Sequence, residues 1–520
     1  MKTARIVYHL ARADFLERVR RYSFLVMLGL VLFLGYQAGI GNLNLWLGQY
    51  RGEYNSAWVG AMMALIGALF FGWFGFFLVK GSVARDRETG VGQIMATTPL
   101  TRLLYMLGKS LSNFAVLVAM VTVLALAGLA VQFWKGENAQ IELIVFLEPF
   151  FLIVLPLMAL VAAIAVLFEA IPFLQGGFGN VVFFFAFILQ MPLFIANDTL
   201  KSYSALEPLG ISLLATEMGK EVAKRYPDYQ GGLTLGTSSA EINGTFLWTG
   251  VDWTSRLVLG RFTLFILAIL TTLFASLFFD RFDPSRSKPR RTKHNTSDSA
   301  PEPVSTALAL PTVHLTPLNI TGNRFSFFTV VLAESRLLIK GQPWWWYVLT
   351  GGIMIACFSA PSAIVRQIVL PIAWVWPILI WSAIGNREIR NNVHQMTFSS
   401  ASPLMRQLPA QWLAGFIVTL LISLGALLRF TLDGETVGLV ALLSGAIFIP
   451  SLALASGVWS GTSKLFEILY MILWYIGPLN NVPALDYIGS HGNGRPEFFI
   501  PFSLALIAFA LFRRARQIRS

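Results

Sequence analysis

The sequence predicts an all-α polytopic membrane protein with about twelve transmembrane helices in two six-helix halves. Three observations support this fold class. Of the 520 residues, 55% are hydrophobic and only 13% are charged, whereas about 25% are charged in a typical soluble domain. Apolar runs long enough to cross a bilayer recur along the whole chain. A basic, polar stretch divides these runs into two sets. The composition excludes a disordered protein, a nucleic-acid-binding domain and an ordinary cytosolic enzyme.

The apolar runs fall into two sets of six. The first set lies at roughly 22–40, 57–79, 111–131, 142–167, 178–196 and 262–280. The second set lies at roughly 344–364, 369–384, 412–428, 437–457, 467–480 and 498–512. The runs 369–384, 467–480 and 498–512 are the weakest, because they are short and broken by Pro or Gly. We expect some of these to be half-helices that do not cross the membrane fully.

The first 21 residues predict a basic amphipathic helix on the membrane surface. Ile6, Leu10 and Ala13 recur at helical spacing, and several arginines lie among them. No small-residue cleavage site follows a short apolar core, so the pattern is not that of a cleavable signal peptide. The same region therefore predicts a retained helix that precedes the first span.

The distribution of basic residues predicts the orientation. The net charge is +12. If the N-terminus is cytoplasmic, most of the 39 Lys and Arg residues fall in loops on that side. We therefore expect a multi-pass protein of the cell membrane, inner or plasma, with both termini in the cytoplasm.

Three segments organise the chain. Residues 1–280 form the first six-helix half, which includes a large outer loop at 197–261 where Leu213–Arg225 predicts a short helix. Residues 281–322 are basic and then rich in Pro, Ser and Thr, which predicts a flexible cytoplasmic linker. Residues 323–520 form the second six-helix half.

The halves show signs of an internal duplication in the loop between their second and third spans. The first loop reads Arg85-Asp86-Arg87-Glu88-Thr89-Gly90, then Thr97-Thr98-Pro99, then Arg102 and Gly108-Lys109. The second loop reads Arg387-Glu388, then Ser400-Ala401-Ser402-Pro403, then Arg406 and Gln411. Each contains Arg-Glu, a small-residue run ending in Pro, and Arg three residues later. In this alignment the distance from Arg-Glu to Pro differs by four residues, which predicts an insertion or drift in the second loop.

This loop pattern resembles the permeases of type 2 ABC exporters, here with both transmembrane halves fused in one chain. In that family the loop holds a coupling helix that docks into an ATPase subunit. The resemblance also covers the amphipathic N-terminal helix and six spans in each half. It implies that two copies of a separate ATP-binding cassette ATPase dock on the coupling-loop residues Arg85, Asp86, Arg87, Glu88, Thr98, Pro99, Arg102, Arg387, Glu388, Pro403 and Arg406.

The residues allow the same interpretation on physical grounds. A cytoplasmic loop between two spans can pass motion to the membrane, and Arg87 and Glu88 can pair with a partner's surface. Pro99 can end a short helix and return the chain to the membrane. An ordinary solvated basic loop is the simpler alternative.

The resemblance also implies the substrate class and the division of labour. It implies export of a lipophilic or amphipathic compound, such as an antibiotic, a drug or a lipid-like molecule. The sequence contains no complete phosphate-binding loop. We therefore expect that the chain is not an enzyme by itself and holds no cofactor, while partner subunits bind ATP and Mg. The five His residues lack metal-ligand spacing.

Two acidic residues near the membrane are candidates for a translocation path or gate. Glu148 precedes Pro149, where backbone carbonyls can be exposed, and Glu169 lies at the inner end of the same span. The alternative for both is an interfacial carboxylate that contacts headgroups or a nearby base.

Two other functions remain open at the level of the sequence. One is a secondary transporter with six-plus-six helices. The spans hold few charges for ion coupling, and the loop after the second span departs from the motif expected of that class. The other is a permease-like membrane sensor or scaffold that transports nothing.

Overall fold

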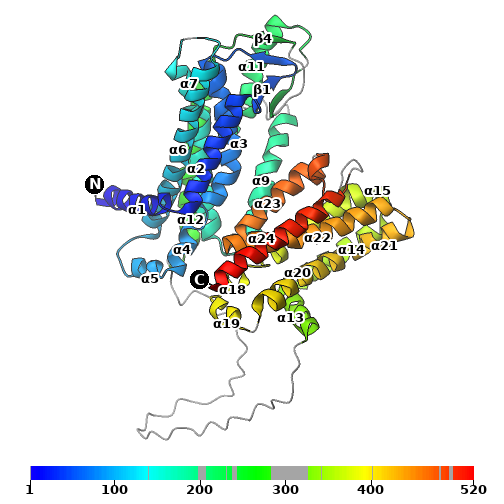
Figure 1. Ribbon diagram of the computed structural model, residues 1–520. Coiled ribbons are helices and arrows are strands. Elements are labelled where there is room, and N and C mark those ends of the chain that lie inside the picture. Colours follow the sequence, from blue (N-terminus) through cyan, green and yellow to red (C-terminus); the bar gives the residue numbers. More distant parts are fainter. Residues whose placement is uncertain are drawn as a thin grey trace, which may run out of the picture. The chain divides into compact units, whose positions relative to one another are not determined.

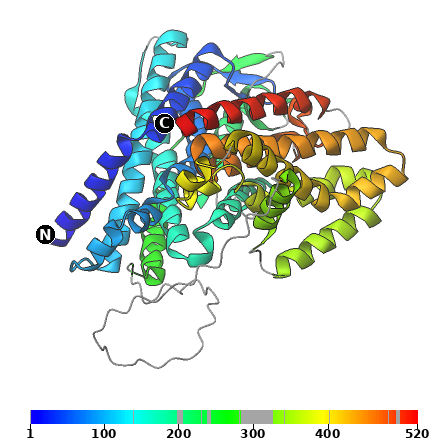
Figure 2. The same ribbon diagram turned by 60° about the horizontal axis from the view of Figure 1, so that its bottom comes forward.

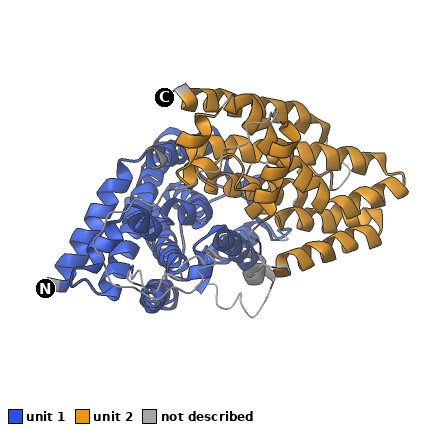
Figure 3. Ribbon diagram, turned by 90° about the horizontal axis from the view of Figure 1, so that it is seen from below, with its two compact units in different colours: residues 1–288 blue, residues 289–520 orange. Residues whose placement is uncertain are grey.

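The computed structural model describes residues 2–138, 140–196, 206–229, 231–236, 243–280, 282, 326–340, 342, 344–400, 402–479, 482–490 and 496–519. The chain forms two compact units, residues 1–288 and 289–520, coloured separately in Figure 3. The predicted linker 281–322 lies outside the described residues, apart from residue 282.

Unit 1 is built mainly from helices, most of which Figure 1 labels. They are α1 (Lys2–Val19), α2 (Tyr22–Ile40), α3 (Ser56–Val79), α4 (Ser82–Glu88), α5 (Val91–Ala96), α6 (Arg102–Lys135), α7 (Leu143–Pro149), α8 (Leu155–Ala170), α9 (Gly177–Ala196), α11 (Ile211–Arg225) and α12 (Ser255–Phe278). A π-helical segment, Phe150–Val154, joins α7 to α8. The axes of α1 and α2 make an angle of 74°. The chain therefore turns sharply between the predicted surface helix and the first apolar run.

The core of unit 1 lies around α3 and α8. In its most apolar window, 72% of the α3 span is buried, whereas only 22% of the α12 window is buried. Close packing here depends on small residues, since a Cβ at Gly60 would lie 2.5 Å from the carbonyl oxygen of Phe146. The exposed apolar face of α12 is what a lipid-facing helix presents.

A small sheet closes one end of unit 1 (Figure 1). Its strands are β1 (Asn44–Leu47), β2 (Tyr50–Gly52), β3 (Leu233–Gly236) and β4 (Gly244–Phe246), in the order β3-β1-β2-β4. The strand β1 is antiparallel to β2 and β3, and β2 is parallel to β4. Helix α11 confirms the short helix predicted within the loop 197–261. The sheet is a small addition that the sequence did not predict, because its strands are too short to show a periodic pattern in the sequence.

Unit 2 consists of helices among its described residues. They are α13 (Phe327–Ile339), α14 (Trp344–Ser359), α15 (Ser362–Ile364), α16 (Leu370–Val375), α17 (Ile378–Trp381), α18 (Arg387–Arg390), α19 (His394–Phe398), α20 (Pro403–Ile422), α21 (Leu424–Leu432), α22 (Thr436–Ser460), α23 (Lys464–Trp474) and α24 (Phe499–Arg519). The central helix is α22, which packs against α20, α21, α23 and α24.

Among the described residues, seven helical segments are long and apolar enough to cross a membrane, or eight if the bent pair α1–α2 counts as one span. The chain is thus a predominantly helical, polytopic membrane protein. The runs 369–384 and 467–480 are short and interrupted as expected: α16 and α17 are separate, and α23 ends in a π-helical segment at Tyr475–Leu479. The run 498–512 differs from these two, because it lies within one continuous helical segment from Pro496 to Ile518 that is long enough to cross a membrane.

Candidate functional site

The loop between α3 and α6, residues 80–101, is held by a carboxylate at the end of a spanning helix. This first loop contains α4 and α5 and lies at the end of unit 1 opposite the sheet, which Figure 2 brings toward the viewer. The backbone N–H groups of Gly81, Ser82, Val83 and Ala84 donate to the Glu169 carboxylate at 2.8, 3.1, 2.6 and 3.1 Å. The first N–H groups of a helix have no partner within it, so the buried carboxylate caps α4 and fixes it to α8.

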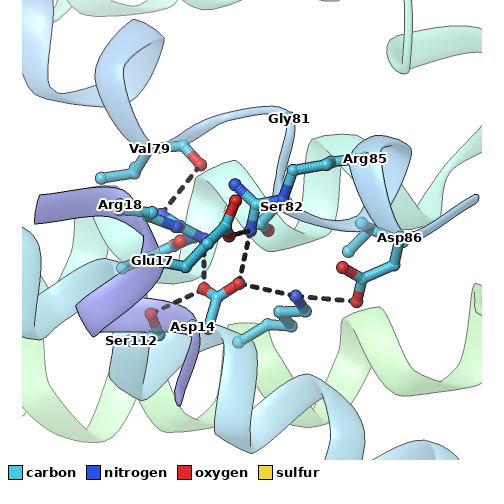
Figure 4. A network of polar contacts seen from close by, with 12 residues as sticks. Asp14, Glu17, Arg18, Val79, Gly81, Ser82, Arg85, Asp86 and Ser112 are labelled. Carbon is cyan, nitrogen blue, oxygen red and sulfur yellow. Dashed lines mark hydrogen bonds and ion pairs between the residues drawn. The ribbon is translucent and has the colours of Figure 1, made fainter. Parts of the chain in front are cut away.

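A buried charge network joins the first loop to α1 and α6 (Figure 4). Asp14 on α1 lies 2.7 Å from Arg18, 2.5 Å from Arg85 and 2.9 Å from Lys109. Lys109 on α6 also lies 2.8 Å from Asp86 on α4. Since each of these charges has an opposite charge within reach, the network can exist in a buried place. It ties the surface helix, the loop and the third apolar run into one assembly.

The loop between α17 and α20, residues 382–402, is held in a related way. Arg387 lies 3.2 Å from Glu334 on α13, the helix that precedes the spans of unit 2. Glu388 is buried and accepts hydrogen bonds from Gln407, at 3.0 Å, and from Gln411, both on α20. Arg514 on α24 lies 3.5 Å from Glu388. Burial raises the pKa of the Glu334 carboxyl above its ordinary value, although Arg387 opposes this shift.

The two loops align without a gap, at a constant offset of 302 residues. The predicted alignment of Arg87-Glu88 with Arg387-Glu388, and with it the four-residue difference, is therefore wrong. In the structure, corresponding residues make corresponding contacts. The pairs are Arg85 and Arg387, Asp86 and Glu388, Tyr105 and Gln407, and Lys109 and Gln411.

The backbone of the two loops supports the same alignment. Gly90 and Asn392, which correspond, both have positive φ angles, of 74° and 55°. The Thr97 hydroxyl donates to the Ile94 carbonyl at 2.8 Å, and the corresponding Ser399 hydroxyl donates to the Met396 carbonyl at 2.9 Å. The short helices α5 and α19 are therefore two copies of one structure.

Each copy presents an apolar residue to the outside. Ile94 on α5 is 69% exposed, and the corresponding Met396 on α19 is 75% exposed. Val91 and Val393 stand three residues earlier and are also exposed. None of these four residues was among the predicted docking residues. The signal that could have found them is the shared Val-x-Gln-(Ile or Met) at 91–94 and 393–396, which the incorrect alignment separated.

The structure separates the predicted loop residues into two groups. Arg85, Asp86, Arg387 and Glu388 are engaged inside their own unit. For Glu388 this corrects the expectation of an exposed coupling residue, because its carboxylate is buried and already hydrogen-bonded. The remaining residues are exposed or half-buried at the loop surface: Arg87, Glu88, Thr98, Pro99, Arg102, Pro403 and Arg406.

The two candidate path residues lie at opposite ends of the segment from α7 to α8. Glu148 is half-buried and accepts a hydrogen bond from the Trp253 indole at 3.0 Å. Glu169 is 4% exposed, and its two oxygens accept the N–H groups of α4. Glu169 thus anchors the first loop to α8, and its assignment to a translocation path or gate stays a prediction.

The described residues hold no group of three or more His, Cys, Asp or Glu that could bind a metal ion. A comparison of the chain with protein-family models, with curated proteins and with solved structures found no match. The two repeated loops are therefore the features of this chain that bear most directly on its function.

Proposed function

We propose that this chain is the membrane-spanning permease of an ATP-driven ABC exporter, with both transmembrane halves fused and about twelve transmembrane helices in all. Two copies of a separate ATPase subunit dock on it, one on each repeated loop, and these partners bind ATP and Mg. The supporting observation is the duplicated loop. Ile94 and Met396 are exposed at equivalent positions of the two copies, and buried polar contacts hold each copy in place. An exposed apolar residue on a short, rigid helix is a suitable anchor for a partner's groove.

The contacts of the first loop suggest how motion would pass from the ATPase to the membrane. A displacement of α5 moves α4, because only Thr89 and Gly90 separate them. Through Glu169 the displacement reaches α8, and through Lys109 it reaches α6 and α1. Buried ion pairs and a helix cap resist local bending, so the loop would act as a rigid lever between two spans and the surface helix.

An apolar cavity within unit 1 supports the proposed substrate class. It has a volume of about 200 Å³ and lies between α3, α8 and α9, where Phe168, Phe183 and Phe187 line it together with Leu157 and Gln190. Aromatic and aliphatic walls with one amide suit the apolar part of a lipophilic or amphipathic compound, such as a drug, an antibiotic or a lipid-like molecule, although the cavity is smaller than a pocket for a whole drug-sized ligand. Export as the direction, and the cell membrane as the location, follow from the family resemblance and the distribution of basic residues.

The experiment that tests this proposal is purification of the tagged chain from its native membrane under mild conditions. We expect a subunit with a phosphate-binding loop to co-purify at about two copies per chain. The single variants Ile94→Glu and Met396→Glu should each lose one copy, and the double variant should lose both. The matched controls Ile94→Leu and Met396→Leu keep an apolar surface and should retain both copies.

Two results would contradict the proposal. One is retention of both ATPase copies by the Ile94→Glu and Met396→Glu double variant, which would exclude this docking surface. The other is a wild-type chain that purifies without any ATPase and hydrolyses no ATP, which would favour a secondary transporter or a scaffold. Gel filtration of each variant confirms that the membrane part is intact.

A further inference from the structure

A groove runs along one side of α13 in unit 2. Its volume is about 600 Å³, and it lies between α13, α14 and α20. Apolar side chains form its walls, among them Phe328, Val331, Leu332, Ile417 and Leu421. Phe328 and Leu332 remain largely exposed even though α13 packs against α20. Helix α13 thus borders an apolar groove that the described residues leave open.

The charged side chains that line this groove, as far as the structure describes them, are both cations. Arg336 and Lys340 stand one helical turn apart near the C-terminal end of α13, with no acidic residue in the lining. Neither forms an ion pair with a described residue, unlike Arg387, which pairs with Glu334 on the buried side of the same helix. The Tyr347 hydroxyl donates to the Ile339 carbonyl at 2.9 Å and fixes the start of α14 beside them.

We propose that this groove binds an anionic glycerophospholipid. One acyl chain lies along the apolar walls, and the phosphate lies between Arg336 and Lys340. The groove is complementary to an occupant with a long apolar part and an anionic group at one end. A zwitterionic lipid would bring its own cation beside Arg336 and Lys340, and a free phosphate would leave the apolar walls exposed. Basic pockets beside membrane helices are a known way to bind anionic headgroups. The proposal does not depend on transport or on an ATPase.

The test is native mass spectrometry of the full chain, purified in detergent and titrated with dioleoylphosphatidylglycerol or dioleoylphosphatidylcholine. We expect the first phosphatidylglycerol to bind the wild-type chain more tightly than phosphatidylcholine. The double variant Arg336→Gln and Lys340→Gln should weaken that binding by about 30-fold. The matched control is Arg12→Gln with Arg20→Gln, which should leave the affinity unchanged. Both arginines are exposed; Arg12 lies on α1 and Arg20 directly follows its end.

A second variant tests the apolar part separately. Leu421→Trp adds bulk to the wall of the groove without changing any charge, and it should also weaken phosphatidylglycerol binding. Inorganic phosphate should not displace the lipid. If Arg12→Gln with Arg20→Gln loses as much phosphatidylglycerol affinity as Arg336→Gln with Lys340→Gln, the proposal is overturned in favour of non-specific charge attraction. Full displacement by inorganic phosphate, or unchanged binding in Leu421→Trp, would overturn the lipid as occupant in favour of a simple anion.

Discussion

Lys109 balances the charge of the first loop. Its side chain is 2% exposed, and its amine lies between the carboxylates of Asp14 and Asp86. Two buried carboxylates this close to each other need a cation, because each loses its hydration. In unit 2 the corresponding residue is the neutral Gln411, and Arg514 supplies the positive charge near Glu388 from another helix. The two loops thus keep one geometry with different charge arrangements.

Substitution of Lys109 should therefore destabilise the protein strongly. Lys109→Met leaves Asp14 and Asp86 without their shared cation, and we expect a loss of about 3–5 kcal/mol in the free energy of unfolding. Thermal unfolding of the full chain in detergent measures this. Lys220→Met is the control, since Lys220 is an exposed lysine on α11 that pairs with a neighbour one turn away. Equal melting temperatures for the two variants would show that the network contributes little.

Glu207, whose carboxylate accepts a hydrogen bond from the start of α11, should make the stability of the protein depend on pH. Burial raises the pKa of the Glu207 carboxyl, while the hydrogen bond from the Ser212 N–H and the charge of Arg261 oppose the shift. Because the pKa of Glu207 is higher in the folded state than in the unfolded state, its contribution to stability is complete below the unfolded-state pKa of about 4.5. That contribution is lost as the pH rises through the folded-state pKa. Glu207→Gln should thus gain in melting temperature relative to wild type as the pH rises above about 4.5. A difference that does not vary between pH 4 and pH 8 would contradict this.

At the scale of elements, the turn between α4 and α5 sets the direction of the exposed helix. Gly90 has a φ of 74°, and the corresponding Asn392 has a φ of 55°. Glycine and asparagine tolerate this left-handed conformation, whereas a β-branched residue does not. Space is not the constraint, since a Cβ at Gly90 would have no atom within 4 Å. Backbone conformation alone therefore selects the residue here.

Asparagine and valine at position 90 should therefore have different effects. Gly90→Asn should leave both stability and ATPase binding close to wild type, because unit 2 already uses asparagine at the equivalent position. Gly90→Val should cost about 1–3 kcal/mol of backbone strain and should weaken binding of one ATPase copy. Thermal unfolding and co-purification measure the two effects. If valine is tolerated as well as asparagine, the turn does not position α5.

At the scale of the whole molecule, two units carry the same loop between equivalent helices. The correspondence includes an amphipathic helix that contributes an acid, Asp14 on α1 and Glu334 on α13, to an arginine of the loop. The proposed function requires a duplication in the same orientation, which would place both loops on one side of the membrane. The basic residues of the sequence favour the cytoplasm for that side.

Cysteine labelling tests this orientation. Cys357 is the single cysteine and is buried, so Cys357→Ala provides a background for new exposed cysteines. Thr89→Cys and Asn391→Cys report on the two loops, and Lys224→Cys reports on α11 beside the sheet. An impermeant maleimide should label only Lys224→Cys in intact cells, and all three after permeabilisation. Labelling of one loop but not the other in intact cells would refute a duplication in the same orientation.

Much of the local structure could be predicted from the sequence. The positions of the apolar runs, the surface helix at the N-terminus and the helix at 211–225 follow from hydropathy and periodicity, which are local properties. The two loops could be found because a short polar pattern stands out between apolar runs. Their alignment could not be predicted, because Arg-Glu occurs at 87–88 in the first loop and at 387–388 in the second. The contacts instead equate Arg85-Asp86 with Arg387-Glu388.

The sequence by itself determined that this chain is a helical membrane protein with a repeated polar loop, because bilayer length and hydropathy act on each segment separately. Only the tertiary structure decided which acids are buried partners and which residues face outward. Glu169 caps α4 from 85 to 88 residues away, and the strands at 44–52 pair with strands near 235 and 245. Such pairings depend on how the helices bring distant residues together, and hydropathy, which is a local property, does not predict these contacts. The exposed positions of Ile94 and Met396 are also set by tertiary structure, because buried contacts of Asp86 and Glu388 hold the loops that carry α5 and α19.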